Sequence, residues 1–365
     1  MNPIAPVIRG CGRAWARFLA LDRVIRVHFL FFSSFLPLLG GSTARRDLDP
    51  AQILALLGVG LCFHLYSYVL NDVCDLPVDR THPARQNDPL VRGTLRTWQA
   101  LLIALVPVPL TVPLTVWLGG GARAYAMLGA GFALMAVYNL WGKRCPIPPL
   151  TDAAQGLAWG SLALYGCLAI GGDPNVLTWL VTLYGAGFLL HINGIHGGLR
   201  DLENDLASGA RTTAIYLGAR PRPGGEVHVP SGVSVFAYSV LVGLAAMLLV
   251  PLLRNDFGYE PGVWTAMLAI AGSLLFVDLL LLAIVMRPNR PRWNVVFRVH
   301  CFSVAAVLPI TFAPFLSAET LAALLLVLVL SFLPLEWARW LRPAYPSPTE
   351  RNAAQRPAPQ EIAAE

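Results

Sequence analysis

Residues 71–79 read Asn-Asp-Val-Cys-Asp-Leu-Pro-Val-Asp, and they follow directly on a mostly apolar run that extends from residue 51 to residue 70. A run of this length is long enough to cross a bilayer as a helix. Acidic side chains are costly next to hydrocarbon, so carboxylates at the end of such a run indicate a function. A second acidic cluster, Asp-Leu-Glu-Asn-Asp at 201–205, follows the apolar run 177–197. Together the clusters suggest divalent cations that hold a polyphosphate against an apolar bundle.

The composition indicates an integral membrane protein. Of the 365 residues, 56% are hydrophobic and 13% are charged, which is unusual for a soluble domain. Apolar runs of about 18 residues or more predict an all-α, polytopic transmembrane helical bundle of nine spans and possibly a tenth at the C-terminus. The candidate spans are residues 24–41, 51–70, 98–119, 122–141, 153–172, 177–197, 232–253, 263–286, 296–316 and 319–338.

The spans divide the chain into three parts. Residues 1–23 carry arginines among apolar side chains and lack the pattern of a cleaved signal peptide, which predicts an amphipathic basic helix on the membrane surface; a disordered basic tail is the alternative. Residues 24–341 form the predicted transmembrane domain. The proline-rich residues 342–365 predict a disordered tail. Six scattered cysteines without CxxC spacing indicate neither zinc nor a disulfide framework.

The net charge of +6 is spread over the loops rather than gathered on one soluble domain, which argues against nucleic acid as a partner. If ten spans are assumed, 23 of the 27 Lys and Arg residues share the side that holds the termini and both acidic clusters. The positive-inside rule therefore predicts that this side is cytoplasmic. The opposite side holds Arg45, Arg46, Arg123 and Arg254.

The oxygen-bearing side chains of each cluster are spaced to share one helix face. Residues four apart on a helix are neighbours, and repulsion between adjacent carboxylates is relieved by a bound cation. Hard oxygen ligands favour Mg²⁺, which commonly shares its coordination with substrate phosphates. The predicted metal ligands are Asn71, Asp72, Asp75, Asp79, Asp201 and Asp205, and those predicted to be essential to catalysis are Asp72, Asp75, Asp201 and Asp205.

Basic residues near the clusters are predicted to neutralise a diphosphate leaving group, because they stabilise negative charge that develops on it. Each is also expected from topology alone, since cytoplasmic loops are rich in arginine. They are Arg80, Arg85, Arg92, Lys143, Arg144, Arg200 and Arg211.

These motifs resemble a known family. The chain is similar, over roughly residues 20–315, to the UbiA superfamily of intramembrane prenyltransferases. The resemblance rests on Asn71-Asp72-x-x-Asp75-x-x-x-Asp79, Pro89-Leu90-x-x-Gly93, the segment 138–143, and Asp201-x-x-x-Asp205 followed by Gly209-x-Arg211-Thr212-Thr213 and Leu217-Gly218. It implies a nine-span bundle around a cavity open to lipid, Mg²⁺ as cofactor, and transfer of an isoprenoid chain from its diphosphate to an acceptor that is often aromatic.

The resemblance also assigns roles to single residues. It implies that both Asp motifs bind Mg²⁺ and diphosphate, and that Tyr138 and Lys143 take the places of a tyrosine and a diphosphate-contacting lysine. One position departs from the pattern, because an arginine usually precedes the Pro-Leu pair and this chain has Asp88. Arg85 or Arg92 is expected to supply the missing charge.

The predicted mechanism is ionisation of an allylic diphosphate in a site that excludes water, followed by capture of the carbocation by the acceptor. The partners are a prenyl diphosphate, a small-molecule acceptor and the lipid bilayer, with no protein partner implied. One alternative is a membrane terpene cyclase, in which the cation reacts with its own double bonds. Another is a cation transporter or scaffold, although transporters place ionisable groups near the bilayer midplane rather than at span ends.

Other polar and aromatic residues within the spans have two interpretations each. Aromatic rings can stabilise a carbocation, but ordinary helix packing also explains them; they are Tyr66, Tyr68, Trp159, Tyr165 and Tyr184. His191, Asn193 and His196 precede the second cluster and could orient or deprotonate the acceptor or act as hydrogen-bonded structural residues.

Overall fold

The computed structural model describes residues 22–82, 85–223, 226–289 and 293–331. The surface helix expected at residues 1–23, apart from Asp22 and Arg23, and the tail expected at residues 342–365 lie outside these residues. In chain order the elements are η1 (Val27–Phe29), α2 (Leu30–Ala44), α3 (Pro50–Cys74), α4 (Leu76–Asp79), α5 (Thr97–Leu105), α6 (Pro107–Trp117), α7 (Ala122–Trp141), η3 (Gly142–Arg144), α8 (Pro148–Ala169), α9 (Val176–His191), η4 (Ile192–Gly197), α10 (Gly198–Arg200), α11 (Leu202–Ala207), α12 (Thr213–Tyr216), β1 (Arg220–Pro221), β2 (Val227–His228), α13 (Ser231–Leu253), α14 (Pro261–Val285), α15 (Trp293–Phe312), η5 (Ala313–Phe315) and α16 (Ala318–Ser331).

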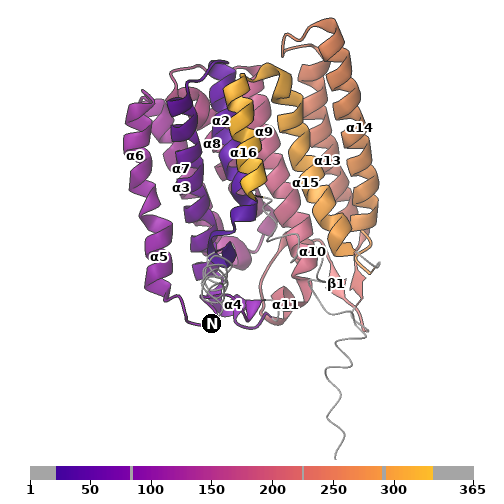
Figure 1. The fold of residues 1–365 in the computed structure, drawn as a ribbon. Helices are drawn as coiled ribbons and strands as arrows, with labels where there is room; N and C mark the ends of the chain where they lie inside the picture. Colours follow the sequence, from indigo (N-terminus) through magenta and orange to yellow (C-terminus); the bar gives the residue numbers. More distant parts are fainter. Residues whose placement is uncertain (1–21, 83–84, 224–225, 290–292, 332–365) are drawn as a thin grey trace, which may run out of the picture.

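The predicted all-α membrane bundle is confirmed (Figure 1). Within the described residues, seven helical segments are long and apolar enough to span a membrane: Pro50–Cys74, Thr97–Trp117, Ala122–Arg144, Val176–Arg200, Ser231–Leu253, Pro261–Val285 and Val295–Phe315. Shorter apolar helices occur at Leu30–Ala44 and Ala318–Ser331, where the first and tenth spans are predicted. The count of nine or ten spans stays a prediction.

Local sequence explains where several helices begin and break. Asp49 starts α3 because its side chain accepts a hydrogen bond from the Gln52 amide, and Pro50 follows at the first helical position. The span predicted at 98–119 is divided into α5 and α6 at Pro107, which has no amide hydrogen to continue the helix. Residues 22–25 are helical, but this helix stops at Arg26, whose backbone is left-handed with φ of 56°, so α2 begins at Leu30 rather than at residue 24.

The centre of the bundle is α8, which packs against α2, α7 and α9. The backbones of α2 and α8 come very close, because glycines stand where they cross. A Cβ atom on Gly40 would lie 2.0 Å from the Ala163 carbonyl oxygen, and one on Gly166 would lie 2.0 Å from that of Pro37. Small residues of this kind let membrane helices gain van der Waals contact without a hydrophobic driving force.

Among the described residues, the first and last apolar helices, α2 and α16, meet in the bundle. In Figure 1, α16 lies beside α2, and the two helices pack together. The Phe31 amide donates a 3.1 Å hydrogen bond to Ser331 Oγ at one end of this contact. At the other end, Arg46 Nη2 donates to the Pro314 carbonyl oxygen at 2.9 Å. The last described helix therefore closes the bundle over the first.

All the elements that carry the acidic clusters lie at one end of the bundle. Figure 1 shows α4, α10 and α11 together at the bottom. The four arginines assigned from the sequence to the opposite side are at or beside the connections α2/α3, α6/α7 and α13/α14, which face the other way. The structure thus separates the two ends as expected, and the compartment that each end faces stays a prediction.

The crossing of α2 and α8 allows a stability test. We expect Gly166→Ala to lower the free energy of unfolding by about 1–3 kcal/mol, because the new methyl group must push the two backbones apart. Gly129→Ala in α7 is the matched control, since a Cβ there meets nothing within 4 Å. Thermal unfolding in detergent measures both variants. Equal stability of the two would show that the crossing is not tightly packed.

Candidate functional site

The first acidic cluster occupies the end of α3 and the short α4. The Asp75 amide donates to the Asn71 carbonyl oxygen at 2.8 Å, and the Asp79 amide donates to the Asp75 carbonyl oxygen at 2.9 Å. The four-residue spacing is therefore kept across the break between the helices. The side chains of Asn71 and Asp75 are also joined, because Asn71 Nδ2 donates to Asp75 Oδ2 at 3.3 Å.

The second cluster is built in the same way at the junction of α10 and α11. The Asp205 amide donates to the Asp201 carbonyl oxygen at 2.9 Å, so the two carboxylates are one helical turn apart. Asp205 is buried, whereas Glu203, between the two carboxylates in the sequence, is exposed.

Lys143 joins the two clusters. It follows α7, in η3, and its Nζ lies 3.4 Å from Asp75 Oδ2 and 3.3 Å from Asp205 Oδ1. Carboxylates that are separated by 130 positions in the sequence thus share one ammonium group. The structure brings both predicted motifs and the predicted lysine together in a single site.

Contacts between the loops hold this arrangement. Thr81 Oγ1 donates to Asn204 Oδ1 at 3.2 Å, which links the segment after α4 to α11. Asn204 Nδ2 donates to the Val78 carbonyl oxygen at 3.4 Å. The Arg211 amide donates to the Lys143 carbonyl oxygen at 2.8 Å, so the segment after the second cluster fixes the backbone of the lysine.

Of the two arginines considered as substitutes at Asp88, Arg85 lies in the site. Its Nη1 is 3.2 Å from Asp88 Oδ2, and its Nε is 4.0 Å from Asp79 Oδ1. Burial lowers the pKa of Arg85, but the surrounding carboxylates outweigh this effect and raise the pKa above its usual value. Arg92 is exposed.

The N-terminal side of the site holds two arginines that sequence reasoning did not select. Arg26 pairs with Asp72 and lies over the Tyr68 ring, 5.2 Å from its centroid. Arg23 Nη1 is 3.4 Å from Asp88 Oδ1. Both precede the first cluster by more than 40 residues, and the sequence offers no signal that would pair them with it.

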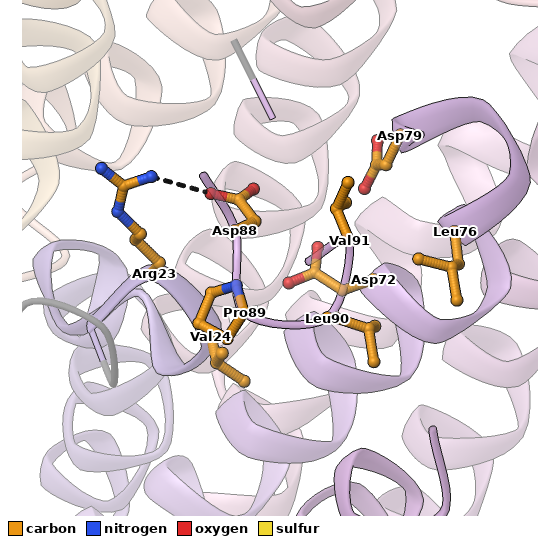
Figure 2. A pocket seen from close by; sticks show the side chains of 9 residues that line it. All are labelled: Arg23, Val24, Asp72, Leu76, Asp79, Asp88, Pro89, Leu90 and Val91. Carbon is orange, nitrogen blue, oxygen red and sulfur yellow. Dashed lines mark hydrogen bonds and ion pairs between the residues drawn. The ribbon is translucent and has the colours of Figure 1, made fainter. Parts of the chain in front are cut away.

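Figure 2 shows a pocket between this N-terminal segment and the first cluster. The carboxylates of Asp72, Asp79 and Asp88 and the Arg23 guanidinium line it together with apolar side chains, so the pocket combines acidic groups with an apolar wall. Its residues are Arg23, Val24, Asp72, Leu76, Asp79, Asp88, Pro89, Leu90 and Val91.

Asp201 has its own basic partners. Arg200 donates to both Asp201 oxygens, at 2.9 and 2.6 Å, and His82 Nε2 lies 3.5 Å from Asp201 Oδ1. His82 is a further site residue that the sequence analysis missed. Its position three residues after Asp79, about one helical turn, is a signal that could have found it.

The electrostatics divide the carboxylates into two kinds. Burial raises the pKa of Asp75 and Asp205, to about 6 for Asp205, and Lys143 offsets only part of this rise. Burial also acts on Asp201, but the charge and hydrogen bonds of Arg200 outweigh it and hold the pKa well below its usual range. The negative charge of the carboxylates around Lys143 is therefore only partly compensated by positive groups.

The remaining predicted residues are more scattered. Tyr138 is half-buried near the end of α7, one helical turn before η3, which carries Lys143. Four basic residues are exposed and have no described place among the carboxylates: Arg80, Arg92, Arg144 and Arg211. The hydroxyls of three of the aromatic candidates, Tyr66, Tyr165 and Tyr184, are hydrogen-bonded to neighbouring helices. These bonds support their structural interpretation.

Tyr68 and Trp159 differ from those three aromatic residues. Tyr68 is one helical turn before Asp72, and its ring meets the buried Trp159 ring edge-on at 5.9 Å. His191 and His196 lie deeper, in a cluster with a third histidine. Asn193, on η4, is half-buried.

Residues 34–280 match the UbiA prenyltransferase family. The chain belongs to this family. It is therefore a multi-pass membrane enzyme of the prenyltransferase class. The digeranylgeranylglyceryl phosphate synthase of Pyrococcus abyssi is 30% identical over 205 residues, which cover 55% of this chain and 70% of the relative. The 4-hydroxybenzoate octaprenyltransferase of Saccharophagus degradans is 28% identical over 218 residues, or 57% and 67% of the two chains.

Solved structures of UbiA homologues share the fold. The apo homologue from Aeropyrum pernix K1 has a TM-score of 0.61 at 17% identity, covering 79% of this chain and 96% of that one. The Archaeoglobus fulgidus homologue bound to GPP and Mg²⁺ has a TM-score of 0.55 at 17% identity, covering 83% and 99%. The UbiA-type helical bundle is thus confirmed.

The surroundings of Arg85 predict its importance for substrate. We expect Arg85→Ala to lower kcat/KM for a prenyl diphosphate by about tenfold or more, because a charge-assisted donor to the diphosphate is lost. Arg92→Ala, a change of the same size on an exposed residue of the same loop, should stay within about twofold. Initial rates at several substrate concentrations measure both. A larger loss for Arg92→Ala would reverse the assignment.

Proposed function

We propose that this enzyme transfers a prenyl group from an isoprenoid diphosphate to an aromatic or other lipid-soluble small-molecule acceptor, with Mg²⁺ as cofactor, at the cytoplasmic edge of the membrane. The observation that carries the proposal is the convergence of Asp75 and Asp205 on Lys143. Membership of the family and the acidic pocket at the end of the bundle support it.

The residues of the site fit Mg²⁺. The donors are carboxylate and amide oxygens, which hard divalent cations prefer. Asp75 and Asp205 have raised pKa values beside a single ammonium group, so a cation placed between the clusters would relieve their repulsion. The residues that would hold it are Asn71, Asp72, Asp75, Asp79, Asp201 and Asp205. When bound there, Mg²⁺ would neutralise charge on the diphosphate leaving group.

The chain's own groups would bind and orient the substrate. Lys143 and Arg85 are cations fixed by carboxylates at the site, and both can donate hydrogen bonds to phosphate oxygens. Leu76 and Leu90 line the pocket beside the carboxylates, and an apolar wall of this kind would limit the access of water to a reactive carbocation. Tyr68 presents an aromatic ring one turn below Asp72, where it could face such a cation.

The relatives support a prenyl diphosphate as donor and leave the acceptor open. The Archaeoglobus fulgidus homologue was solved with GPP and Mg²⁺ and also with DMAPP and Mg²⁺. The names of the two enzymes compared above refer to different compounds, a glyceryl phosphate and 4-hydroxybenzoate. We therefore propose a prenyl diphosphate of unspecified chain length as the donor and a lipid-soluble small molecule as the acceptor.

Substitutions at the converging carboxylates test the proposal. We expect Asp75→Asn and Asp205→Asn each to lower kcat by about 100-fold or more, because each removes charge that stabilises the transition state through the bound cation. Glu203→Gln, in the same segment but exposed, is the matched control and should retain activity. Membrane insertion and thermal stability are checked for all three. Full turnover by either Asp variant would refute the role of the site.

The same assay separates transfer from cyclisation. The purified enzyme is incubated with prenyl diphosphates of several lengths, with and without a lipid and phenolic extract of the host, and products are identified by mass spectrometry. A transferase requires the extract. Release of a terpene hydrocarbon or alcohol from the diphosphate alone would instead identify a cyclase.

The orientation has a separate test. Cys145 lies two residues after Lys143 and is partly exposed, at the end of the bundle that holds the site. In a variant with Cys145 as its single cysteine, we expect a membrane-impermeant thiol reagent to label inverted vesicles and not right-side-out ones. Labelling of right-side-out vesicles would place the site on the outer face.

A further inference from the structure

Three histidines meet inside the bundle, away from the acidic clusters. His191 ends α9, His196 lies in η4, and His300 is on α15; each is completely buried. One potential ligand atom from each residue lies within 4.8 Å of those of the other two. His191 Nε2 and His300 Nε2 are 3.3 Å apart. Asp278 of α14 is also completely buried, and its Oδ1 is 3.5 Å from His300 Nδ1.

The backbone between His191 and His196 departs from the α-helical form. In an α-helix, residues five apart differ in direction by about 140°, because the helix has about 3.6 residues per turn. The segment Ile192–Gly197 is a π-helix, whose wider turn brings residues five apart nearly into line. The rings of His191 and His196 consequently face one another, with centroids 5.0 Å apart. Such π-helical turns occur frequently at functional sites.

Several polar atoms of this cluster have no hydrogen-bond partner among the described residues. They are both carboxylate oxygens of Asp278, Nδ1 of His191 and His300, and Nε2 of His196. A buried carboxylate without a partner is costly, and more so inside a membrane-spanning bundle. A positive charge among the three imidazoles would compensate Asp278.

The distances suit a metal ion. Metal–nitrogen bonds of about 2.0–2.1 Å at tetrahedral angles place two ligand nitrogens about 3.3 Å apart, which is the separation of His191 Nε2 and His300 Nε2. Histidines that bind metals commonly give their other ring nitrogen to a carboxylate or another acceptor. Asp278 has this position behind His300, and Cys301 Sγ is 2.8 Å from His196 Nδ1. His196 Nε2 is then left for the ion.

We propose that His191, His196 and His300 bind one first-row transition-metal ion of the Zn²⁺ type, with Asp278 as the outer carboxylate that orients His300. Imidazole nitrogens select such an ion over Mg²⁺, which prefers the oxygen donors of the acidic clusters. The ion links α9, η4 and α15 directly, and α14 through Asp278. The cysteine spacing in the sequence does not indicate zinc, and this site instead combines His191 and His196 with a histidine more than 100 residues later in the chain.

The test is the metal content and spectrum of the full-length protein in detergent. We expect one Zn²⁺ per chain by elemental analysis after purification without chelators. Replacement by Co²⁺ should give the visible absorption of a tetrahedral site, and chelation should lower the melting temperature. A folded wild-type protein with neither bound metal nor this Co²⁺ absorption would overturn the proposal.

Variants locate the ion. His300→Asn should abolish Co²⁺ absorption, and Asp278→Asn should weaken Zn²⁺ affinity by about 10–100-fold, as loss of an outer partner does. The Asp278 variant keeps all three histidines, so it remains informative if His300→Asn fails to fold. His228→Asn, outside the bundle in β2, is the control and should bind normally. The double variant Asp75→Asn, Asp205→Asn should also keep its Zn²⁺. Loss of the metal in the double variant would instead place the ion at the acidic clusters.

Discussion

The organisation of this protein depends on one charge interaction, the ammonium group of Lys143 between Asp75 and Asp205. Carboxylates at the edge of a region of low dielectric constant repel one another strongly and are poorly solvated. A single cation makes their approach possible without neutralising both, so uncompensated negative charge remains at the site. The helix ends, the loop contacts of Asn204 and the backbone bond to Arg211 all serve to keep these three side chains in place.

The rigid packing of the interior makes this convergence possible. The two clusters are carried by α3–α4 and by α10–α11, and α8 lies between α7 and α9 and ties both sides to α2. Because Gly40 and Gly166 allow backbone contact, the centre of the bundle has little room for adjustment. The acidic end, by contrast, consists of short helices and loops that interact through polar side chains.

Much of the fold and the core of the site could be predicted from local signals. The lengths of the apolar runs predicted the helices, and the four-residue spacing predicted which carboxylates share a face. Pairings between distant segments could not be predicted, because hydropathy and spacing contain no information on how loops return to the bundle. Arg26 therefore appeared as one basic residue among many, although it pairs with Asp72. As candidates for the charge that is missing at Asp88, Arg85 and Arg92 could not be distinguished from the sequence. Only the path of their loop places one of them in the site. His300 and Asp278 lie within apolar runs, and the order of these runs along the chain does not show which helices pack together.

The contact between α2 and α16 has a consequence for how the protein is made. Ribosomes synthesise α2 long before α16, yet the Phe31 amide donates a hydrogen bond to Ser331 Oγ at the end of α16. The flank of α2 that α16 covers must therefore stay uncovered in the bilayer, or be held by an insertion factor, until α16 has been synthesised and inserted. Premature termination before α16 would leave that flank exposed to lipid and to quality-control proteases.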